Sequence, residues 1–149
     1  MKKAMKNKEV KELISLVSEK YSYELPKDER YEKNDNIILV NNEPLFFYFE
    51  EKIVPSLRLL LDDMILKKIT IDMGAVPYAA KGADMMRPGI TNIDDSIEKD
   101  DFVVVIDETH SKPIAVGVAL FNSQDIKTMY AGKVVKNIHY IGDNIWNSA

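Results

Sequence analysis

The chain has 149 residues, of which 46% are apolar and 30% charged, which is the balance of a folded globular protein. It contains no cysteine, which excludes disulfide scaffolds, cysteine-based zinc sites, iron–sulfur clusters and thiol catalysis. Its 20 basic and 24 acidic side chains give a net charge of -4. This charge argues against a protein that coats nucleic acid with its whole surface, but it leaves room for a local basic face.

No apolar run approaches the roughly 18 residues that suggest a transmembrane helix. Charged side chains also interrupt any signal-peptide core near the start of the chain. We therefore expect a soluble, cytoplasmic protein that makes no membrane contact.

The first 66 residues predict a small α/β domain. Apolar side chains recur at helical spacing at Val10, Leu13, Ile14, Val17 and Tyr21. The charged stretch 27–35 is expected to form a loop or an edge strand, followed by strands over 37–40 and 45–49 with a four-residue turn between them. Pro55 is expected in the first turn of a helix with its apolar face at Leu57, Leu60, Leu61, Met64 and Ile65.

Residues 67–149 predict a β-rich second domain. Short strands are expected over 69–73, 84–90, 102–106, 114–121 and 133–141. Two short helices are expected, one over 75–80 with Gly82 at its C-terminal end and one that Asn122 or Ser123 begins. Gly117 is expected to mark a bulge. The spacing favours a compact barrel over a parallel sheet, so the fold class is α+β.

The sequence offers no set of residues suited to catalysis. It contains no phosphate-binding glycine motif, and its two histidines, His110 and His139, lack metal-ligand spacing. The acidic loop 94–101 lacks the pattern of a calcium-binding loop. Adjacent carboxylates such as Glu50 and Glu51 diverge on a strand or helix and do not converge as an acid–base pair. We therefore expect no enzyme activity, no metal and no cofactor.

What remains is a distribution of cations. No acid occurs between Asp125 and Asp143, an interval that contains Lys127, Lys133, Lys136 and His139. Further cations are Lys81, Arg87 and the pair Lys67-Lys68. Lysines on a surface need no function, but Arg87-Pro88-Gly89 places a rigid fork of donors beside backbone that a ligand can approach.

Three segments together resemble a PUA domain, a family named for pseudouridine synthases and archaeosine transglycosylases. They are ITIDMGAVPYAAKGADMMRPGI (69–90), PIAVGVA (113–119) and GKVVKNIHYIGD (132–143). The ending DNIW (143–146) is similar to the translation-associated subgroup related to the malignant T-cell-amplified protein, which has archaeal members. The resemblance implies a pre-PUA domain over 1–66 and a PUA pseudobarrel of short mixed strands over 67–149.

The resemblance further implies that the pseudobarrel binds structured RNA, such as a tRNA acceptor stem, rather than DNA. The RNA face would consist of the first short helix, the strand after it and the last strand. Its residues are Ala75, Val76, Lys81, Gly82, Ala83, Met85, Arg87, Pro88, Gly89, Lys133, Lys136 and His139. One of Met85 and Met86 is expected in the core, and Trp146 is expected to close the barrel.

Three functions stay open at this point. The first is a non-enzymatic RNA-binding protein of translation or of tRNA or rRNA metabolism. By analogy with eukaryotic relatives, its partners would include the small ribosomal subunit and a protein with an initiation-factor-like domain. The second is a protein-interaction adaptor on the ribosome. The third is an accessory subunit that presents RNA to a separate modification enzyme.

Overall fold

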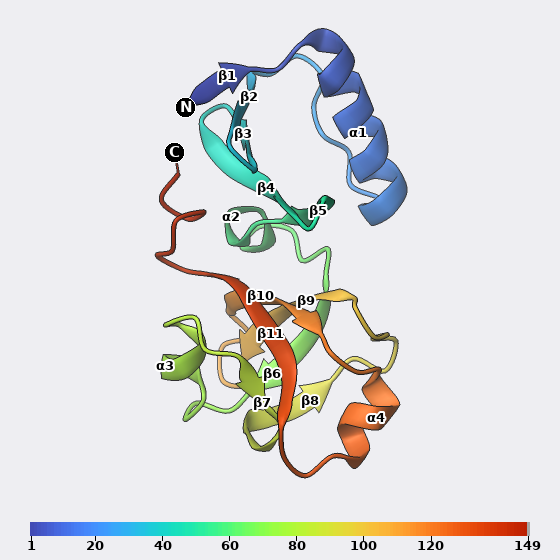
Figure 1. Ribbon diagram of the computed structural model, residues 1–149, viewed down its shortest axis with the longest axis vertical. Coiled ribbons are helices and arrows are strands. Elements are labelled where there is room, and N and C mark those ends of the chain that lie inside the picture. The colour runs from blue at the N-terminus through green and yellow to red at the C-terminus, as the bar shows by residue number, and fades with distance from the viewer. Residues whose placement is uncertain (149) are drawn as a thin grey trace. The chain divides into compact units, whose positions relative to one another are not determined.

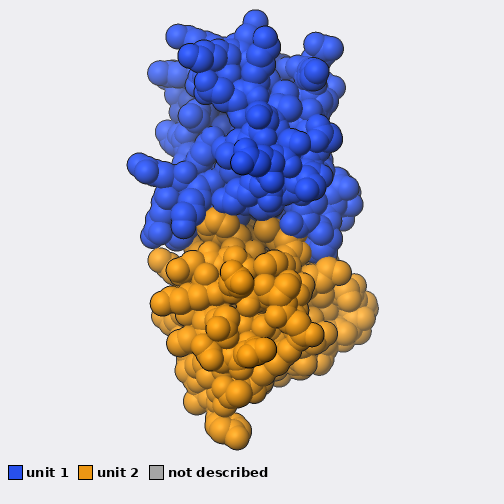
Figure 2. All heavy atoms as spheres, turned by 90° about the vertical axis from the view of Figure 1, so that its right-hand side faces the viewer, with its two compact units in different colours: residues 1–65, 144–149 blue, residues 66–143 orange. Residues whose placement is uncertain are grey.

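The computed structural model describes residues 1–148, and these divide into two compact units. One contains residues 1–65 and the C-terminal segment from residue 144, and the other contains residues 66–143 (Figure 2). Sequence analysis had placed the C-terminal segment in the second domain. The Trp146 ring lies 3.8 Å from the Arg58 guanidinium, which also donates a 3.1 Å hydrogen bond to the Trp146 carbonyl. The expectation that Trp146 closes the barrel was therefore wrong.

The first unit is a five-stranded antiparallel sheet in the order β1-β2-β3-β4-β5, with α1 packed on one face (Figure 1). Leu13 and Val17 of α1 are buried against Ile38 and Phe46 of the sheet. Its elements are β1 (Lys2–Ala4), α1 (Asn7–Tyr21), β2 (Tyr31–Asn34), β3 (Ile37–Val40), β4 (Glu43–Phe49), β5 (Lys52–Pro55) and α2 (Leu57–Leu60). The predicted first helix is confirmed, because its apolar spacing matches the buried face.

Four expectations for this unit were wrong. The hairpin connection has two residues rather than four, because Asn41 and Asn42 both adopt positive φ and form a tight turn. A second two-residue turn at Glu50–Glu51 leads into β5, so Pro55 ends a strand instead of starting a helix. The helix that follows has four residues and ends at Leu60. β2 pairs with both β1 and β3 and is not an edge strand.

The second unit is a six-stranded sheet in the order β7-β11-β10-β9-β6-β8. Its strands are β6 (Lys67–Ile71), β7 (Met85–Met86), β8 (Ile90–Ile93), β9 (Phe102–Asp107), β10 (Pro113–Ala119) and β11 (Lys133–Tyr140). The end strands β7 and β8 are joined directly by a single 3-10 turn, Arg87–Gly89, so the sheet curls into a nearly closed pseudobarrel. All pairings are antiparallel except that of β6 with β9.

Two short helices accompany this barrel, α3 (Val76–Ala79) and α4 (Ser123–Thr128). Asn122 begins α4, because its side-chain oxygen accepts the Asp125 N–H at 2.8 Å. The α+β class and the mixed short strands expected from sequence are confirmed. The strand expected over 84–90 is instead two strands, β7 and β8, separated by the turn Arg87–Gly89. None of the helices in residues 1–148 is long and apolar enough to span a membrane.

Gly117 stands at the bulge that the sequence predicts, where the register of β10 and β11 shifts. A Cβ at this position would lie 2.3 Å from Cγ1 of Val135 and 2.7 Å from the Lys136 carbonyl oxygen. The absence of a side chain therefore lets β11 approach β10 closely.

We expect Gly117→Ala to lower the free energy of unfolding by about 1–3 kcal/mol, the cost of forcing extra atoms into a packed site. Gly74→Ala is the matched control, since its nearest neighbour, Oδ1 of Asp72, is at an ordinary 3.4 Å. The control should stay within about 0.5 kcal/mol of the wild type in urea denaturation. Equal destabilisation by both substitutions would contradict the close approach at Gly117.

Candidate nucleic-acid interface

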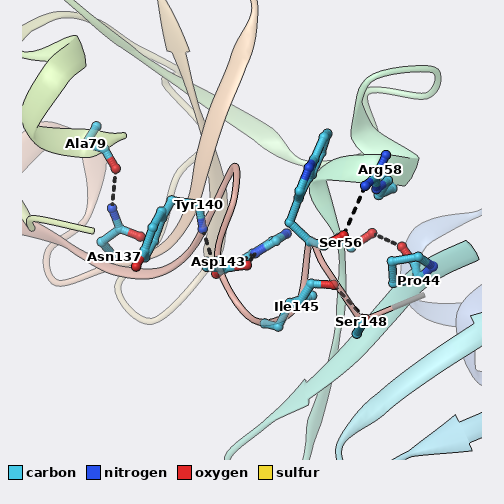
Figure 3. A network of polar contacts seen from close by, with 11 residues as sticks. Pro44, Ser56, Arg58, Ala79, Asn137, Tyr140, Asp143, Ile145 and Ser148 are labelled. Atoms are coloured by element: carbon cyan, nitrogen blue, oxygen red, sulfur yellow. Dashed lines mark hydrogen bonds and ion pairs between the residues drawn. The ribbon is translucent and has the colours of Figure 1, made fainter. Parts of the chain in front are cut away.

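The structure brings α3 and β11 together, as the sequence-based RNA face requires. The Asn137 side-chain amide donates to the Ala79 carbonyl at 3.1 Å (Figure 3). It also donates to the Ala83 carbonyl at 3.0 Å. Gly82 adopts a φ of +96°, and a Cβ there would lie 2.8 Å from the Tyr140 ring. Two amide hydrogen bonds therefore hold the loop after α3 against β11, and the absence of a side chain at Gly82 lets the loop approach Tyr140 closely.

The two lysines of β11 are exposed on this face. Val134 and Val135 between them point into the core, so Lys133 and Lys136 stand on the outer side. Lys81 is also exposed, in the loop after α3. These three predicted cations are accessible to a ligand, and Ala83 and Pro88 are exposed near them in the chain.

An acid that sequence analysis did not consider as part of the face lies among these cations. Asp84 forms a 2.8 Å ion pair with Lys133, and its other oxygen accepts the Asn137 N–H at 2.8 Å. Burial alone would raise the pKa of Asp84, but the hydrogen bonds and the charges of Lys133 and Lys136 hold it below its usual value. Asp84 therefore stays ionised and offsets part of the positive charge.

Arg87 does not present the free fork of donors expected from the sequence. Its Nε donates to the Ile126 carbonyl at 2.7 Å and its Nη1 donates to the Ile90 carbonyl at 3.1 Å. Its backbone N–H donates to the Gly132 carbonyl at 2.8 Å. The side chain is half-buried and joins three segments of the barrel. A substitution at Arg87 would therefore remove hydrogen bonds that stabilise the barrel, and its effect on RNA binding could not be attributed to a phosphate contact alone.

Two other predicted residues are buried. Met85 is 3% exposed in the core, and Met86 is the one of the pair that faces outward. His139 is 0% exposed, and its Nδ1 lies 2.9 Å from the Asp143 carboxylate. His139 cannot present its ring to RNA as expected, because the protein encloses its side chain. Contact of Met85 with RNA stays a prediction, since Met85 forms part of the wall of the hollow described next.

Beside the lysines lies a hollow of about 400 Å³. Its walls include the predicted residues Ala75, Met85, Pro88 and Gly89, together with Tyr78, Asp84 and Met86. Val76 does not line it and packs against the core instead. A Cβ on Gly89 would lie 3.0 Å from the Ala75 Cβ, so the turn after β7 and the start of α3 are in close contact.

Sequence analysis missed Tyr78, left open which of Met85 and Met86 is buried, and placed Met85 rather than Met86 on the RNA face. Tyr78 is 69% exposed and Met86 51%, although both are large and apolar. Large apolar side chains that stay exposed around a hollow mark a binding surface. The signal in the sequence is an aromatic residue on a four-residue helix, which is too short to bury all its side chains.

Residues 1–148 contain no group of three or more histidines, aspartates and glutamates placed to hold a metal ion. The arrangement combines exposed lysines, an apolar hollow and one exposed aromatic ring. Such a surface can hold phosphates by charge and stack an unpaired base.

Residues 67–141 match the sequence profile of the PUA domain, and residues 2–63 match a profile described as a domain of unknown function, DUF1947. The chain is 46% identical to an uncharacterized protein of Methanocaldococcus jannaschii over 74% of this chain and 69% of that protein. It is 35% identical to translation machinery-associated protein 20 of Schizosaccharomyces pombe over 70% of this chain, and it spans only 60% of that relative. For the malignant T-cell-amplified sequence 1 homolog of Dictyostelium discoideum the identity is 34%, over 76% and 65% of the two chains.

Two solved structures match over nearly the whole chain. A hypothetical protein of Pyrococcus horikoshii is 33% identical, and a conserved PUA domain protein of Thermoplasma acidophilum is 27% identical. Each has a TM-score of 0.81 and covers 99% of both chains. An H/ACA RNP structure bound to a substrate RNA matches 66% of this chain and 30% of its own, with 26% identity and a TM-score of 0.53.

These matches confirm the resemblance on which the sequence analysis relied. The profiles cover both parts of the chain, and the relatives include archaeal and eukaryotic proteins. The chain belongs to the PUA-domain family, within the group that joins archaeal PUA proteins to translation machinery-associated protein 20 and malignant T-cell-amplified sequence 1.

Proposed function

We propose that this chain binds the unpaired end of a structured RNA, such as the acceptor stem of a tRNA, and acts in translation without catalysis. The observation that carries the proposal is the hollow with exposed Tyr78 and Met86 beside the lysines of β11. Sequence-specific binding of RNA targets single-stranded ends and loops, because their bases can leave the stack and meet aromatic side chains.

The hollow and the lysines are parts of one surface. Asp84 lines the hollow and is ion-paired to Lys133, and Met86 is the cross-strand neighbour of Lys133 in the register of β7 and β11. A base in the hollow would therefore leave its phosphates within reach of β11. Phosphate contacts position the strand, while contacts with the base decide which strand binds.

The role in translation is supported by the relatives. PUA domains bind RNA, and the yeast relative is named as a translation machinery-associated protein. We propose the small ribosomal subunit and a protein with an initiation-factor-like domain as partners of the bound state.

A second role, presenting RNA to a separate modification enzyme, is supported by the likeness to a chain of an H/ACA RNP bound to substrate RNA. Crosslinking the chain to RNA in cells and sequencing the bound RNA separates the two roles. Recovery of tRNA ends or small-subunit rRNA supports translation. Recovery of guide RNAs or modification substrates supports presentation, and failure to recover RNA favours the adaptor.

We expect Tyr78→Ala to weaken binding of a stem–loop RNA with a single-stranded 3′ end. Loss of one base–aromatic stack costs about 1–3 kcal/mol, or about fivefold to 150-fold in Kd. Tyr130→Ala is the matched control, since Tyr130 is 94% exposed in the same unit but does not line the hollow. Fluorescence anisotropy with labelled RNA gives both affinities. The hollow is not the base site if the two variants bind alike.

We expect Lys133→Gln with Lys136→Gln to lower both affinity and its dependence on salt. Each lost phosphate contact on a single strand reduces the slope of log K against log salt by about 0.7, so the double variant should lose about 1.4. Lys99→Gln with Lys112→Gln makes the same change in net charge at exposed positions of the same unit. An unchanged slope in the first variant, or an equal change in the second, counts against this face.

We expect Asp84→Asn to strengthen RNA binding by roughly threefold at low salt, the scale of a partly exposed charge interaction. Asparagine keeps an oxygen for the Asn137 N–H and removes the charge that pairs with Lys133. Because the pKa of Asp84 is lowered by folding, its carboxylate stabilises the fold above the ordinary aspartate pKa, and this contribution is lost as pH falls through the lowered value. The variant should therefore be slightly less stable at pH 7.

Glu98→Gln is the control for Asp84→Asn, because it removes one exposed acid elsewhere in the unit. It should leave affinity within about 1.5-fold of the wild type, since charges beyond a Debye length of about 8 Å are screened. Weaker binding by Asp84→Asn would show that the carboxylate helps to hold RNA rather than opposing it.

A further inference from the structure

The first unit carries a second group of cations, which the sequence analysis did not single out. Residues 1–11 contain five lysines and one acid, whereas residues 12–65 contain six basic and twelve acidic side chains. All five lysines are exposed, on β1 and on the start of α1. We call this group the N-terminal lysine surface; its residues are Lys2, Lys3, Lys6, Lys8 and Lys11.

On β1, Lys3 faces like charge, whereas Lys2 lies opposite Asn34 and its ammonium group donates to Asn42. Lys3 pairs directly with Lys33 in the register of β1 and β2, and cations in such cross-strand positions repel each other. Both side chains, with Lys6, line a hollow of about 380 Å³ that also includes Glu9 and Asp35. The Lys33 ammonium group lies 5.5 Å from the centre of the Tyr48 ring, and this cation–π contact favours its position beside the hollow.

On α1 the lysines oppose the helix dipole. Lys6 is the N-cap residue of this 15-residue helix, and Lys8 follows in its first turn. Acidic side chains are favoured there, because the first turn carries partial positive charge. The one acid, Glu9, accepts the Lys6 backbone N–H at 3.1 Å and completes the start of the helix. Within residues 1–148, no carboxylate forms an ion pair with any of the five lysines.

A purely structural explanation covers part of this arrangement. Lysines on an edge strand prevent pairing with other chains, and β1 is an edge strand. This accounts for Lys2 and Lys3 but not for Lys6, Lys8 and Lys11, which lie outside the strand. A bound anion such as a phosphate would relieve the repulsion on β1 and at the start of α1 together.

The chemistry of the surface favours a nucleic-acid backbone over an acidic protein. Among the large apolar side chains of residues 1–11, Met1 alone is mostly exposed. Protein interfaces depend on buried aromatic or apolar anchors at their centre, which this surface does not offer. Lysines act as point charges suited to phosphates.

We propose that the N-terminal lysine surface binds the phosphate backbone of RNA, as a second contact independent of the hollow in the PUA domain. The proposal rests on the proposed function only in that both concern RNA. Its sequence-independent contact would add affinity for a long structured RNA and none for a short oligonucleotide that fills the hollow.

The test uses the full chain and three probes: a tRNA-sized structured RNA, a short single-stranded oligonucleotide, and poly-glutamate. Lys3→Gln, Lys6→Gln and Lys8→Gln are combined in one variant. The control combines Lys20→Gln, Lys27→Gln and Lys52→Gln, which are exposed in the same unit and make the same change in net charge. Circular dichroism confirms that both variants are folded.

We expect the first variant to bind the structured RNA about tenfold more weakly at 0.1 M salt, with a slope reduced by about 2, and to bind the oligonucleotide like the wild type. The control should bind both RNAs within twofold of the wild type. Equal losses in the two variants, or a loss for poly-glutamate without a loss for RNA, would overturn the proposal. The double variant Lys133→Gln with Lys136→Gln separates the two contacts. If it binds both RNAs like the wild type while the variant at Lys3, Lys6 and Lys8 binds the structured RNA more weakly, the proposed function fails and this inference stands.

Discussion

The closing of the six-stranded sheet by the turn Arg87–Gly89 is the constraint on which the second unit depends. In a flat sheet its end strands, β7 and β8, would lie about 24 Å apart, five spacings of about 4.8 Å. The three residues between them span at most about 14 Å, so the sheet must curl. Arg87 holds this closure by bonding the carbonyls of Ile90 and Ile126. The same turn places Gly89 against Ala75, which makes one wall of the hollow.

Most of the regular structure could be predicted because its signals are local. Helix α1 follows from apolar spacing, α4 from the cap at Asn122, and the bulge from Gly117. The failures concern positions where two local outcomes are equally compatible with the residues. Proline suits a first helical turn and also the end of an edge strand, which is where Pro55 lies. Glutamates seldom adopt positive φ, so nothing marked Glu50–Glu51 as a turn or revealed β5.

Sequence predicts the exposure of only some residues of the candidate site, and the reason is physical. Exposed lysines are visible in a sequence because charge keeps them at the surface, as at Lys133 and Lys136. Whether a polar side chain instead meets an internal partner depends on segments far away in the chain. Arg87 meets the Ile126 carbonyl, and His139 is enclosed with Asp143. The exposure of Tyr78 was missed for the opposite reason. A large apolar side chain is expected inside the protein, but α3 has only four residues and leaves the Tyr78 ring exposed.

The net charge does not predict where this protein can attract RNA, because basic and acidic residues are unevenly distributed along the chain. Five lysines and one acid occupy residues 1–11, and five acids gather in the loop 94–101, away in sequence from the lysines of β11. Attraction to phosphate acts over about 8 Å, so a strand of RNA meets one local face and not the total of -4. Acidic regions repel the same strand, and this repulsion narrows the orientations in which it can approach. In the proposed complexes, the excess of acid would therefore orient RNA on the cationic faces, and the ion pair of Asp84 with Lys133 would limit how strongly the face on β11 binds.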